Sequence, residues 1–155
     1  MKIGVVSSEG GHLIEALNIL DSFEGNDIFS ITYDVPHIKD FSDPRIKRTY
    51  FVGMGKTRLR LFFRLLFSTF KFIRIFIKEK PKILFSTGSE IAIPAFYIGK
   101  LFFGTKLIFV ESIAKFHEPS VTGKVIYPIA DLFMVPWQSL LKAYGPKAQF
   151  VGELI

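Results

Sequence analysis

The residues best suited to chemistry stand together near the start of the chain, in the segment Ser7-Ser8-Glu9-Gly10-Gly11-His12. This segment follows the apolar run Lys2–Val6 and precedes a stretch of helical periodicity. Gly10 and Gly11 allow positive φ and a close approach of another molecule to the backbone. His12 stands at the start of the expected helix, where the dipole disfavours a proton on its ring. A neutral imidazole in this position favours a general base, and a helix-capping or loop-ordering role is the alternative.

Two further polar loops follow predicted strands. Ser86-Thr87-Gly88-Ser89-Glu90 comes directly after Lys82–Phe85, and the segment Glu111–Thr122 comes after Lys106–Val110. In doubly wound α/β sheets, ligands bind beyond the carboxyl ends of the parallel strands. The three loops are therefore predicted to converge on one ligand-binding crevice.

Apolar runs and helical patterns alternate along the whole chain, which is typical of an α/β fold with a parallel sheet. We expect a single Rossmann-like doubly wound parallel sheet in one domain covering residues 1–155, since about 100–200 residues suit one domain. The first helix buries Leu13, Ala16, Leu17 and Leu20. The other predicted elements are strands at Lys2–Val6, Ile28–Tyr33, Arg48–Val52, Lys82–Phe85, Lys106–Val110, Asp131–Val135 and Ala148–Val151, and helices at Leu59–Ile77, Ile91–Phe103 and Trp137–Tyr144.

Several classes of site are disfavoured by the sequence. Asp34 ends a predicted strand where a ribose-binding acid would stand, but the first loop does not spell G-x-G-x-x-G, which argues against a nicotinamide or flavin site. No P-loop follows a strand. The chain has no Cys and only three His, so neither thiolate chemistry nor a metal cluster is indicated. We expect no cofactor and no metal in this chain.

The positive charge of the chain is concentrated in one segment. Between Lys56 and Lys82 there are nine basic residues and one acid, Glu79. In the predicted helix, at about 57–79, five of these basic residues fall within about 80° of one another, namely Arg60, Arg64, Lys71, Arg74 and Lys78. The rest of its surface is almost entirely Leu, Phe and Ile. The helix therefore has more apolar surface than one contact with a sheet can bury.

This basic helix is predicted to lie on a membrane surface rather than to cross the membrane. Its longest stretch without charge is Leu65–Phe70, far short of the roughly 20 apolar residues that a span needs. A basic stripe beside a large apolar face is typical of interfacial helices. A protein partner or a simple core helix is the alternative, and nucleic acid is weaker because the aromatic residues lie off the basic face. The expected membrane-binding residues are Arg60, Phe63, Arg64, Phe67, Lys71, Arg74 and Lys78.

The polar loops and neighbouring motifs together resemble a known family, the membrane-anchoring, acceptor-side subunit of two-chain UDP-sugar glycosyltransferases. They also resemble the N-terminal half of the peptidoglycan lipid N-acetylglucosaminyltransferase. The match covers nearly the whole chain in order. The motifs are Ser8-Glu-Gly-Gly-His12, Ser86-Thr-Gly-Ser-Glu90, Phe109-Val-Glu-Ser112, Pro119-Ser-Val-Thr-Gly-Lys124, Tyr127-Pro-Ile-Ala-Asp131 and Val135-Pro-Trp137.

The resemblance implies the acceptor-side half of a GT-B glycosyltransferase, with the UDP-sugar donor bound mainly by a separate catalytic subunit. It implies that His12 lies near the acceptor hydroxyl, where an inverting transfer needs a base. Glu90, Glu111 and Glu118 are the other candidates, of which Glu111 is the second expected catalytic residue. Lys115 stands where arginine is common in the family. The expected acceptor- or phosphate-binding residues are Ser8, Gly10, Gly11, Thr87, Gly88, Ser89, Glu90, Ser112, Ser120, Thr122 and Gly123.

The resemblance and the basic helix together imply a membrane-associated subunit that binds a polyprenyl-phosphate-linked saccharide and recruits the donor-binding subunit, without nucleic acid as a partner. No signal peptide precedes the first strand, so a peripheral position on the cytoplasmic face of the membrane is expected. Two alternatives remain open at this point. One is a self-sufficient homo-oligomeric glycosyltransferase, and the other is a non-catalytic membrane scaffold.

Overall fold

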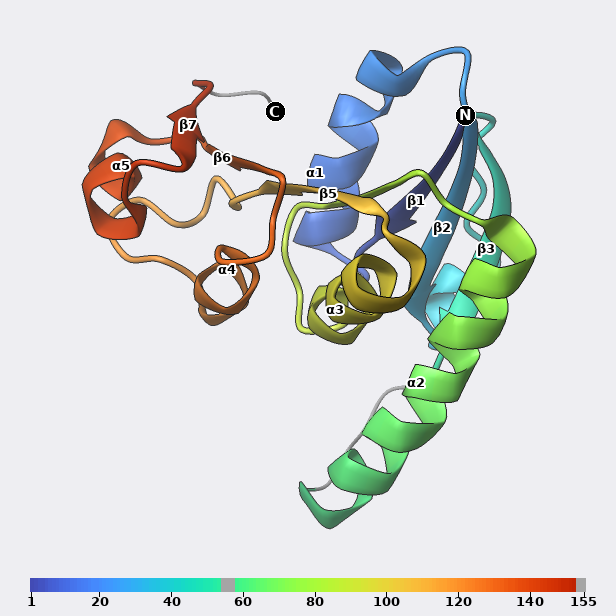
Figure 1. The fold of residues 1–155 in the computed structure, drawn as a ribbon. Helices are drawn as coiled ribbons and strands as arrows, with labels where there is room; N and C mark the ends of the chain where they lie inside the picture. Colours follow the sequence, from blue (N-terminus) through green and yellow to red (C-terminus); the bar gives the residue numbers. More distant parts are fainter. Residues whose placement is uncertain (54–57, 153–155) are drawn as a thin grey trace.

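The computed structural model describes the backbone of residues 1–53 and 58–152, and the side chains in these ranges except those of residues 37 and 58–68. Within them, all strands belong to one parallel sheet (Figure 1). The α/β class and the parallel, Rossmann-like sheet are confirmed. The strands are β1 (Lys2–Val6), β2 (Asp27–Tyr33), β3 (Ile46–Val52), β4 (Ile83–Ser86), β5 (Lys106–Val110), β6 (Leu132–Val135) and β7 (Ala148–Phe150).

The strand order of the sheet is β3-β2-β1-β4-β5-β6-β7. The chain winds outward from β1 to β3, crosses to the other side of β1, and then winds outward again from β4 to β7. The order therefore reverses between β1 and β4. In doubly wound sheets, the loops that leave the carboxyl ends of the two strands at such a switch point diverge and open a crevice.

Helices cover both faces of the sheet, as the doubly wound prediction requires. They are α1 (Gly11–Ile19), α2 (Arg58–Glu79), α3 (Ala92–Phe103), α4 (Val121–Ile126) and α5 (Gln138–Tyr144), with short 3₁₀ turns at Leu20–Phe23 and Pro36–Ile38. Side chains of α1 pack against Ile3 and Val5 of β1, whereas α2 and α3 pack on the face that Val6 and Leu84 line. Neighbouring residues of β1 thus point into different cores, which is the period of two expected for a strand.

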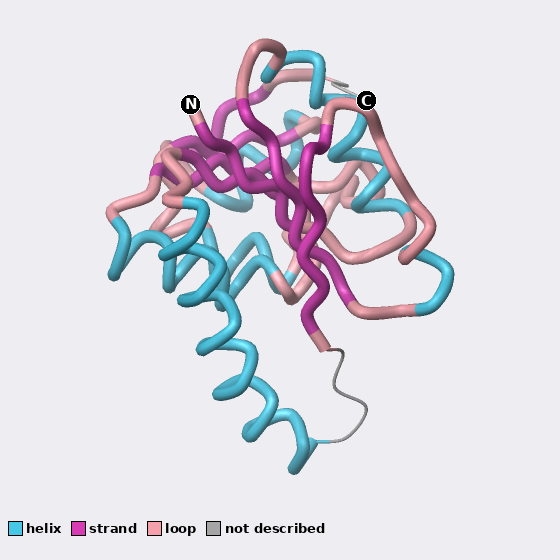
Figure 2. Tube along the Cα trace, turned by 90° about the vertical axis from the view of Figure 1, so that its right-hand side faces the viewer, coloured by secondary structure: helices cyan, strands magenta, loops and turns pink. Residues whose placement is uncertain are grey.

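The helix α2 packs against the sheet along its carboxyl half. Phe72, Ile75 and Phe76 are buried there, whereas Phe70 and Ile77 are 65% and 59% exposed. Both views show the amino half of the helix extending away from the sheet (Figures 1 and 2). The predicted surplus of apolar surface is therefore confirmed where side chains are described.

The predicted membrane-binding residues fall into two groups. Lys71, Arg74 and Lys78 lie on the exposed side of α2. The side chains of Arg60, Phe63, Arg64 and Phe67 lie outside the described part of the structure. Within the described ranges, no helix has the length and apolar character needed to cross a bilayer.

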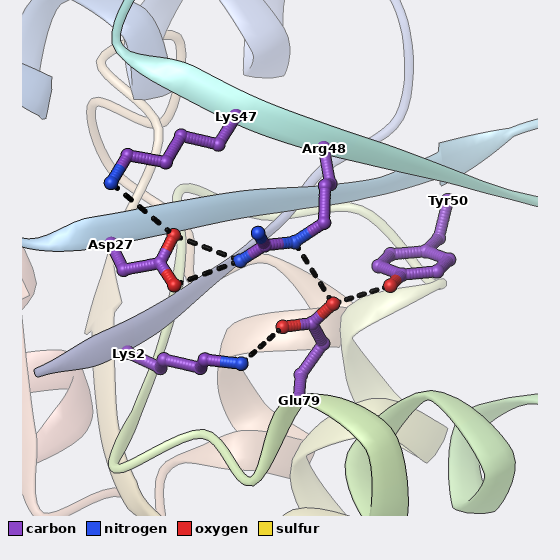
Figure 3. Close-up of polar contacts among 6 residues, drawn as sticks. All are labelled: Lys2, Asp27, Lys47, Arg48, Tyr50 and Glu79. Atoms are coloured by element: carbon purple, nitrogen blue, oxygen red, sulfur yellow. Dashed lines mark hydrogen bonds and ion pairs between the residues drawn. The ribbon is translucent and has the colours of Figure 1, made fainter.

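A network of charges joins the carboxyl end of α2 to three strands, β1, β2 and β3 (Figure 3). Glu79 is 2% exposed, and its carboxylate accepts hydrogen bonds from Tyr50 and from Lys2 Nζ, the latter at 2.9 Å. Arg48 Nε lies 3.0 Å from the same carboxylate. Arg48 also donates to both carboxylate oxygens of Asp27, at 2.8 and 2.9 Å. The long helix is thus anchored at one end while its other end projects from the body.

The structure corrects the predicted elements in two places. The third strand begins at Ile46 rather than Arg48, so Arg48 lies inside it and reaches the Glu79 network. The helix α4 was not predicted. It begins at Val121, inside the polar segment Glu111–Thr122, because Ser120 accepts a hydrogen bond from Gly123 N and caps the helix start. The other boundaries also agree within two residues, and Gly104 ends α3 in the left-handed conformation, with φ of 61°.

Candidate active-site cleft

A cleft of about 380 Å³ opens at the carboxyl edge of the sheet. It is formed by the loops that follow β1, β4 and β5, so the predicted convergence of these three loops is confirmed. The first two of these strands are the pair at the switch point. The lining residues are Gly11, His12, Glu15, Gly88, Ser89, Glu90, Glu111, Ser112, Ala114, Lys115, Ser120 and Thr122.

His12 lies in the first turn of α1 with its side chain 35% exposed. Its ring packs directly on the backbone of Gly88, where an added Cβ would stand 2.6 Å from Cε1 and 2.8 Å from Nδ1. Thr87 Oγ1 donates a hydrogen bond of 2.7 Å to the backbone carbonyl of His12. The loop after β4 therefore fixes both the backbone and the ring of the histidine.

The side chain of Glu15 lies behind the His12 ring, one turn further along α1. Glu15 Oε1 accepts a hydrogen bond of 2.6 Å from Ser112 Oγ, and Oε2 lies 3.5 Å from His12 Nδ1. The contact with Glu15 raises the pKa of His12 above its usual value, in spite of the opposing effect of burial. The expectation that the helix dipole lowers this pKa is wrong, because a carboxylate nearby outweighs the dipole.

Glu111 lies at the end of β5 and is 1% exposed. Its Oε1 accepts from Ser112 N at 3.0 Å, and its Oε2 accepts from Ser120 N at 3.1 Å and from the Tyr144 hydroxyl. Gly123 packs against the same carboxylate, leaving no room for a Cβ. Three donors thus occupy the Glu111 carboxylate, and the bonds join β5, the start of α4 and α5. Burial and the bond to Glu111 raise the pKa of Tyr144.

Ser89 and Glu90 form the side of the cleft that leads into α3. Ser89 is 6% exposed and has φ of 80°, a conformation that non-glycine residues adopt mainly in turns and functional sites. Its Oγ is buried and has no hydrogen-bond partner in the described part of the chain. Glu90 accepts a bond of 3.0 Å from the Tyr33 hydroxyl, whose pKa is raised by burial and by Glu90.

Nine of the predicted ligand-binding and catalytic residues line the cleft, namely Gly11, His12, Gly88, Ser89, Glu90, Glu111, Ser112, Ser120 and Thr122. Ser8, Gly10, Thr87 and Gly123 are not among the lining residues, and Glu118 lies in an exposed part of the loop before α4. Among the side chains that the structure describes, no group of three or more acidic or histidine residues is arranged to hold a metal ion.

Sequence reasoning did not single out Glu15, Tyr144 or Tyr33 as parts of the site. Of these three residues, only Glu15 is indicated by the sequence, since it is the acidic residue of α1 and stands three residues after His12. Ser112, which binds it, stands 97 residues away in the sequence. Such a contact is visible only once the strands are placed side by side.

The family model for "Oligosaccharide biosynthesis protein Alg14 like" matches residues 45–154 of the chain. The chain belongs to the Alg14-like family. The resemblance drawn from the loop motifs is thereby confirmed. The matched region contains the loops after β4 and β5, whereas the loop with His12 lies before it.

Curated relatives of this Alg14-like chain carry the name "UDP-N-acetylglucosamine transferase subunit ALG14". The protein from Debaryomyces hansenii is 30% identical over an alignment of 179 positions that covers 99% of this chain and 76% of the relative. The protein from Candida albicans is 32% identical over 84 residues, which is 51% of this chain and 38% of the relative. A match of 45% identity to the Kluyveromyces lactis protein covers only 21% of that relative.

Solved structures share the fold of the Alg14-like chain. MurG from Acinetobacter baumannii matches with a TM-score of 0.75 and 16% identity, over 98% of this chain and 45% of MurG. UDP-GlcNAc 2-epimerase from Methanocaldococcus jannaschii, in complex with UDP-GlcNAc and UDP, matches with a TM-score of 0.74 over 46% of that chain. The Alg14-like chain spans less than half of each of these neighbours. This agrees with the prediction that its fold corresponds to one half of a GT-B protein.

Proposed function

We propose that this Alg14-like chain is the acceptor-binding subunit of a membrane-associated, heteromeric glycosyltransferase. The complete enzyme transfers a sugar from a UDP-sugar to a polyprenyl-phosphate-linked saccharide, and this chain recruits the donor-binding catalytic subunit to the membrane. The name of the relatives, a UDP-N-acetylglucosamine transferase subunit, supports UDP-N-acetylglucosamine as the donor. The observation that carries the proposal is the polar cleft at the switch point, with His12 at its edge.

The phosphate groups of the acceptor bind between the loops after β1 and β4. The helix α1 begins at Gly11 beside the cleft, and Ser89 and Glu90 lead into α3, so the positive ends of both helix dipoles lie near the bound anion. Ser89 Oγ is a buried donor without a partner in the described chain, which a phosphate oxygen would satisfy. Lys115 adds a positive charge on the wall formed by the loop after β5.

His12 removes the proton of the acceptor hydroxyl as its oxygen attacks the anomeric carbon of the donor sugar. The bond between that carbon and the UDP oxygen breaks, and UDP leaves with the electron pair. Such proton transfer typically contributes about 10²–10⁴-fold to the rate. Glu111 is less suited to this step than the sequence suggests, because its two oxygens already accept three hydrogen bonds. It holds the loop with Ser112 and Ser120 in place instead.

The exposed face of α2 attaches the subunit peripherally to the cytoplasmic face of a membrane. Phe70 and Ile77 are largely exposed on this face, beside the basic Lys71, Arg74 and Lys78. Aromatic and aliphatic side chains enter the headgroup region while basic ones contact anionic lipids, as in interfacial helices. The Glu79 network holds the carboxyl end of the helix against the sheet, so the cleft keeps a fixed position relative to the lipid surface.

A transfer assay separates this proposal from its alternatives. UDP-N-acetylglucosamine and a polyprenyl-diphosphate-linked sugar are incubated with this chain, with a candidate donor-binding subunit encoded nearby, or with both. We expect transfer only with both chains. Robust transfer by this chain alone would contradict the two-subunit proposal and indicate a self-sufficient homo-oligomer. Transfer by the pair that is unaffected by substitutions in the cleft would indicate a scaffold.

A further inference from the structure

The buried carboxylate of Glu15 has no evident role in folding the helix that carries it. The other buried side chains of α1 are the apolar Leu13, Ala16 and Ile19, and Glu15 lies among them with 6% of its surface exposed. Among the described residues, one of its oxygens, Oε1, has a hydrogen bond, from Ser112 Oγ at 2.6 Å. The other oxygen, Oε2, is buried without a hydrogen bond in the described part of the chain. A half-satisfied buried carboxylate is costly and calls for a second partner.

That partner is the imidazole of His12. Glu15 Oε2 lies 3.5 Å from His12 Nδ1, and this nitrogen is itself buried without a hydrogen bond among the described residues. Two unpaired polar atoms of complementary kind thus face each other at the long end of hydrogen-bond range. Hydrogen bonds between catalytic groups are often long without substrate and shorten when the substrate binds.

We propose that Glu15 is a positioning residue for His12. Its carboxylate, held by Ser112, keeps the proton of the neutral imidazole on Nδ1 and presents Nε2 to the cleft. The catalytic consequence rests on the proposed function of His12 as the base, whereas the arrangement of the ring does not.

The surroundings of the ring support one orientation. Gly88 lies against the Cε1–Nδ1 side of the ring, where even a Cβ would be too close at 2.6 Å. Thr87 holds the His12 carbonyl at 2.7 Å, so the backbone beneath the ring is also fixed. The ring is therefore held by the loop after β4 and by Glu15, and Nδ1 is the nitrogen turned away from solvent.

The proton balance of the step follows from this orientation. Nε2 takes the proton of the acceptor hydroxyl, and the imidazolium that forms carries its second proton on Nδ1, facing the negative Glu15. Glu15 keeps its charge throughout and stabilises the imidazolium, as a carboxylate does beside a catalytic histidine. The other charged groups around the ring are Glu111 from the end of β5, and Glu90 and Lys115 across the cleft.

Nuclear magnetic resonance of the imidazole nitrogens tests the arrangement in the full chain without any activity. The variants are Glu15→Gln and Ser112→Ala, and the control is Glu24→Gln, which removes an exposed carboxylate after α1. We expect His12 to be the Nδ1-protonated tautomer with a pKa above the ordinary value of about 6.5. Glu15→Gln should lower the pKa and mix the tautomers, Ser112→Ala should have a smaller effect, and the control none. An unchanged His12 in folded Glu15→Gln would overturn the proposal.

The pH dependence of turnover in the reconstituted pair tests the catalytic consequence. Glu15→Gln should lower kcat by about 10²-fold, the lower end of the contribution of a general base, and leave KM nearly unchanged. The acidic limb of the kcat profile should shift to lower pH, because His12 then loses its proton more easily. Glu15→Asp should restore part of the rate. A changed tautomer with unchanged kcat would support the arrangement but contradict the base role of His12 in the proposed function.

Discussion

The imidazole of His12 lies against the backbone of Gly88, so closely that a Cβ at residue 88 would stand 2.6 Å from the ring. Gly88 also has φ of 136°, in the region that only glycine adopts readily. Two loops far apart in the sequence, after β1 and β4, thus meet at the switch point of the sheet. A glycine is therefore required at residue 88 both by the backbone conformation of its own turn and by the close packing of the His12 ring.

Gly88→Ala should therefore displace the His12 ring and reduce transfer by the reconstituted pair by at least about tenfold, since small misplacements of catalytic groups are costly. The measurement is kcat together with the thermal midpoint. The control is Gly104→Ala, which also has a positive φ, of 61°, but where an added Cβ would meet no atom within 4 Å. The control should lose some stability, of the order of 1 kcal/mol, and retain turnover. Equal turnover of the two variants would show that the Gly88 contact does not position His12.

Tyr144→Phe removes one of three donors to the buried Glu111 carboxylate. Hydrogen bonds to charged groups contribute about 1.5–3 kcal/mol, compared with about 0.5–1.5 kcal/mol for neutral ones. Tyr97→Phe is the matched control, because the Tyr97 hydroxyl donates to the neutral carbonyl of Val125 at 3.1 Å. Denaturant unfolding should give the larger loss of stability for Tyr144→Phe. If Tyr97→Phe costs as much, Glu111 does not depend on the tyrosine.

Reversal of two charges on α2 should weaken binding to anionic lipid vesicles. Each basic residue near such a surface contributes about 1 kcal/mol, so Lys71→Glu with Arg74→Glu should lower the partition coefficient at least roughly 30-fold. Lys124→Glu with Lys142→Glu is the control with the same change in net charge, at exposed positions on α4 and α5. Binding of the unaltered chain should also fall with rising salt, because exposed charges are screened. Identical losses in both double variants would indicate a general charge effect rather than an α2 interface.

The Glu79 network should make the stability of the chain sensitive to acid. Burial raises the pKa of Glu79, but the bonds from Tyr50 and Lys2 and the charge of Arg48 outweigh it, so the pKa lies below its usual value. A depressed folded-state pKa stabilises the protein above the unfolded pKa of about 4.3, and this contribution is lost as the pH falls through the folded pKa. In Glu79→Gln, the thermal midpoint should therefore fall less steeply with decreasing pH below about pH 4.3 than in the unaltered chain. The control Glu24→Gln should leave the acid limb as it is, and an unchanged limb in Glu79→Gln would contradict the role of the network.

The sheet could be predicted from the sequence because its strands are short, strongly apolar runs that end in polar loops. Once parallel strands are assumed, their loops must meet at one edge, which is why Ser89 and Ser112 were placed in the same cleft without any coordinates. The end of α3 was predictable from Gly104, because glycine readily adopts the left-handed conformation that ends a helix. These predictions depend on patterns within about ten residues.

The parts that sequence did not reveal depend on long-range contacts. The pairs Glu15–Ser112 and Tyr33–Glu90 are separated by 97 and 57 residues. The short helix α4 was missed for a different reason, since it spans six residues and contains Gly123, and so shows little helical pattern. The pKa of His12 was predicted in the wrong direction because the helix dipole is visible in the sequence, whereas the contact with Glu15 requires the folded geometry.

The measurement that bears most directly on the cleft is the turnover of His12→Ala in the reconstituted pair, with acceptor binding and thermal stability measured on the same samples. We expect kcat to fall about 10²–10⁴-fold while acceptor binding changes little and association with the donor-binding subunit does not change. His12→Gln, which cannot take up the proton at neutral pH, should be nearly as poor. Near-normal turnover in a folded, assembled His12→Ala complex would contradict the assignment of His12 as the base.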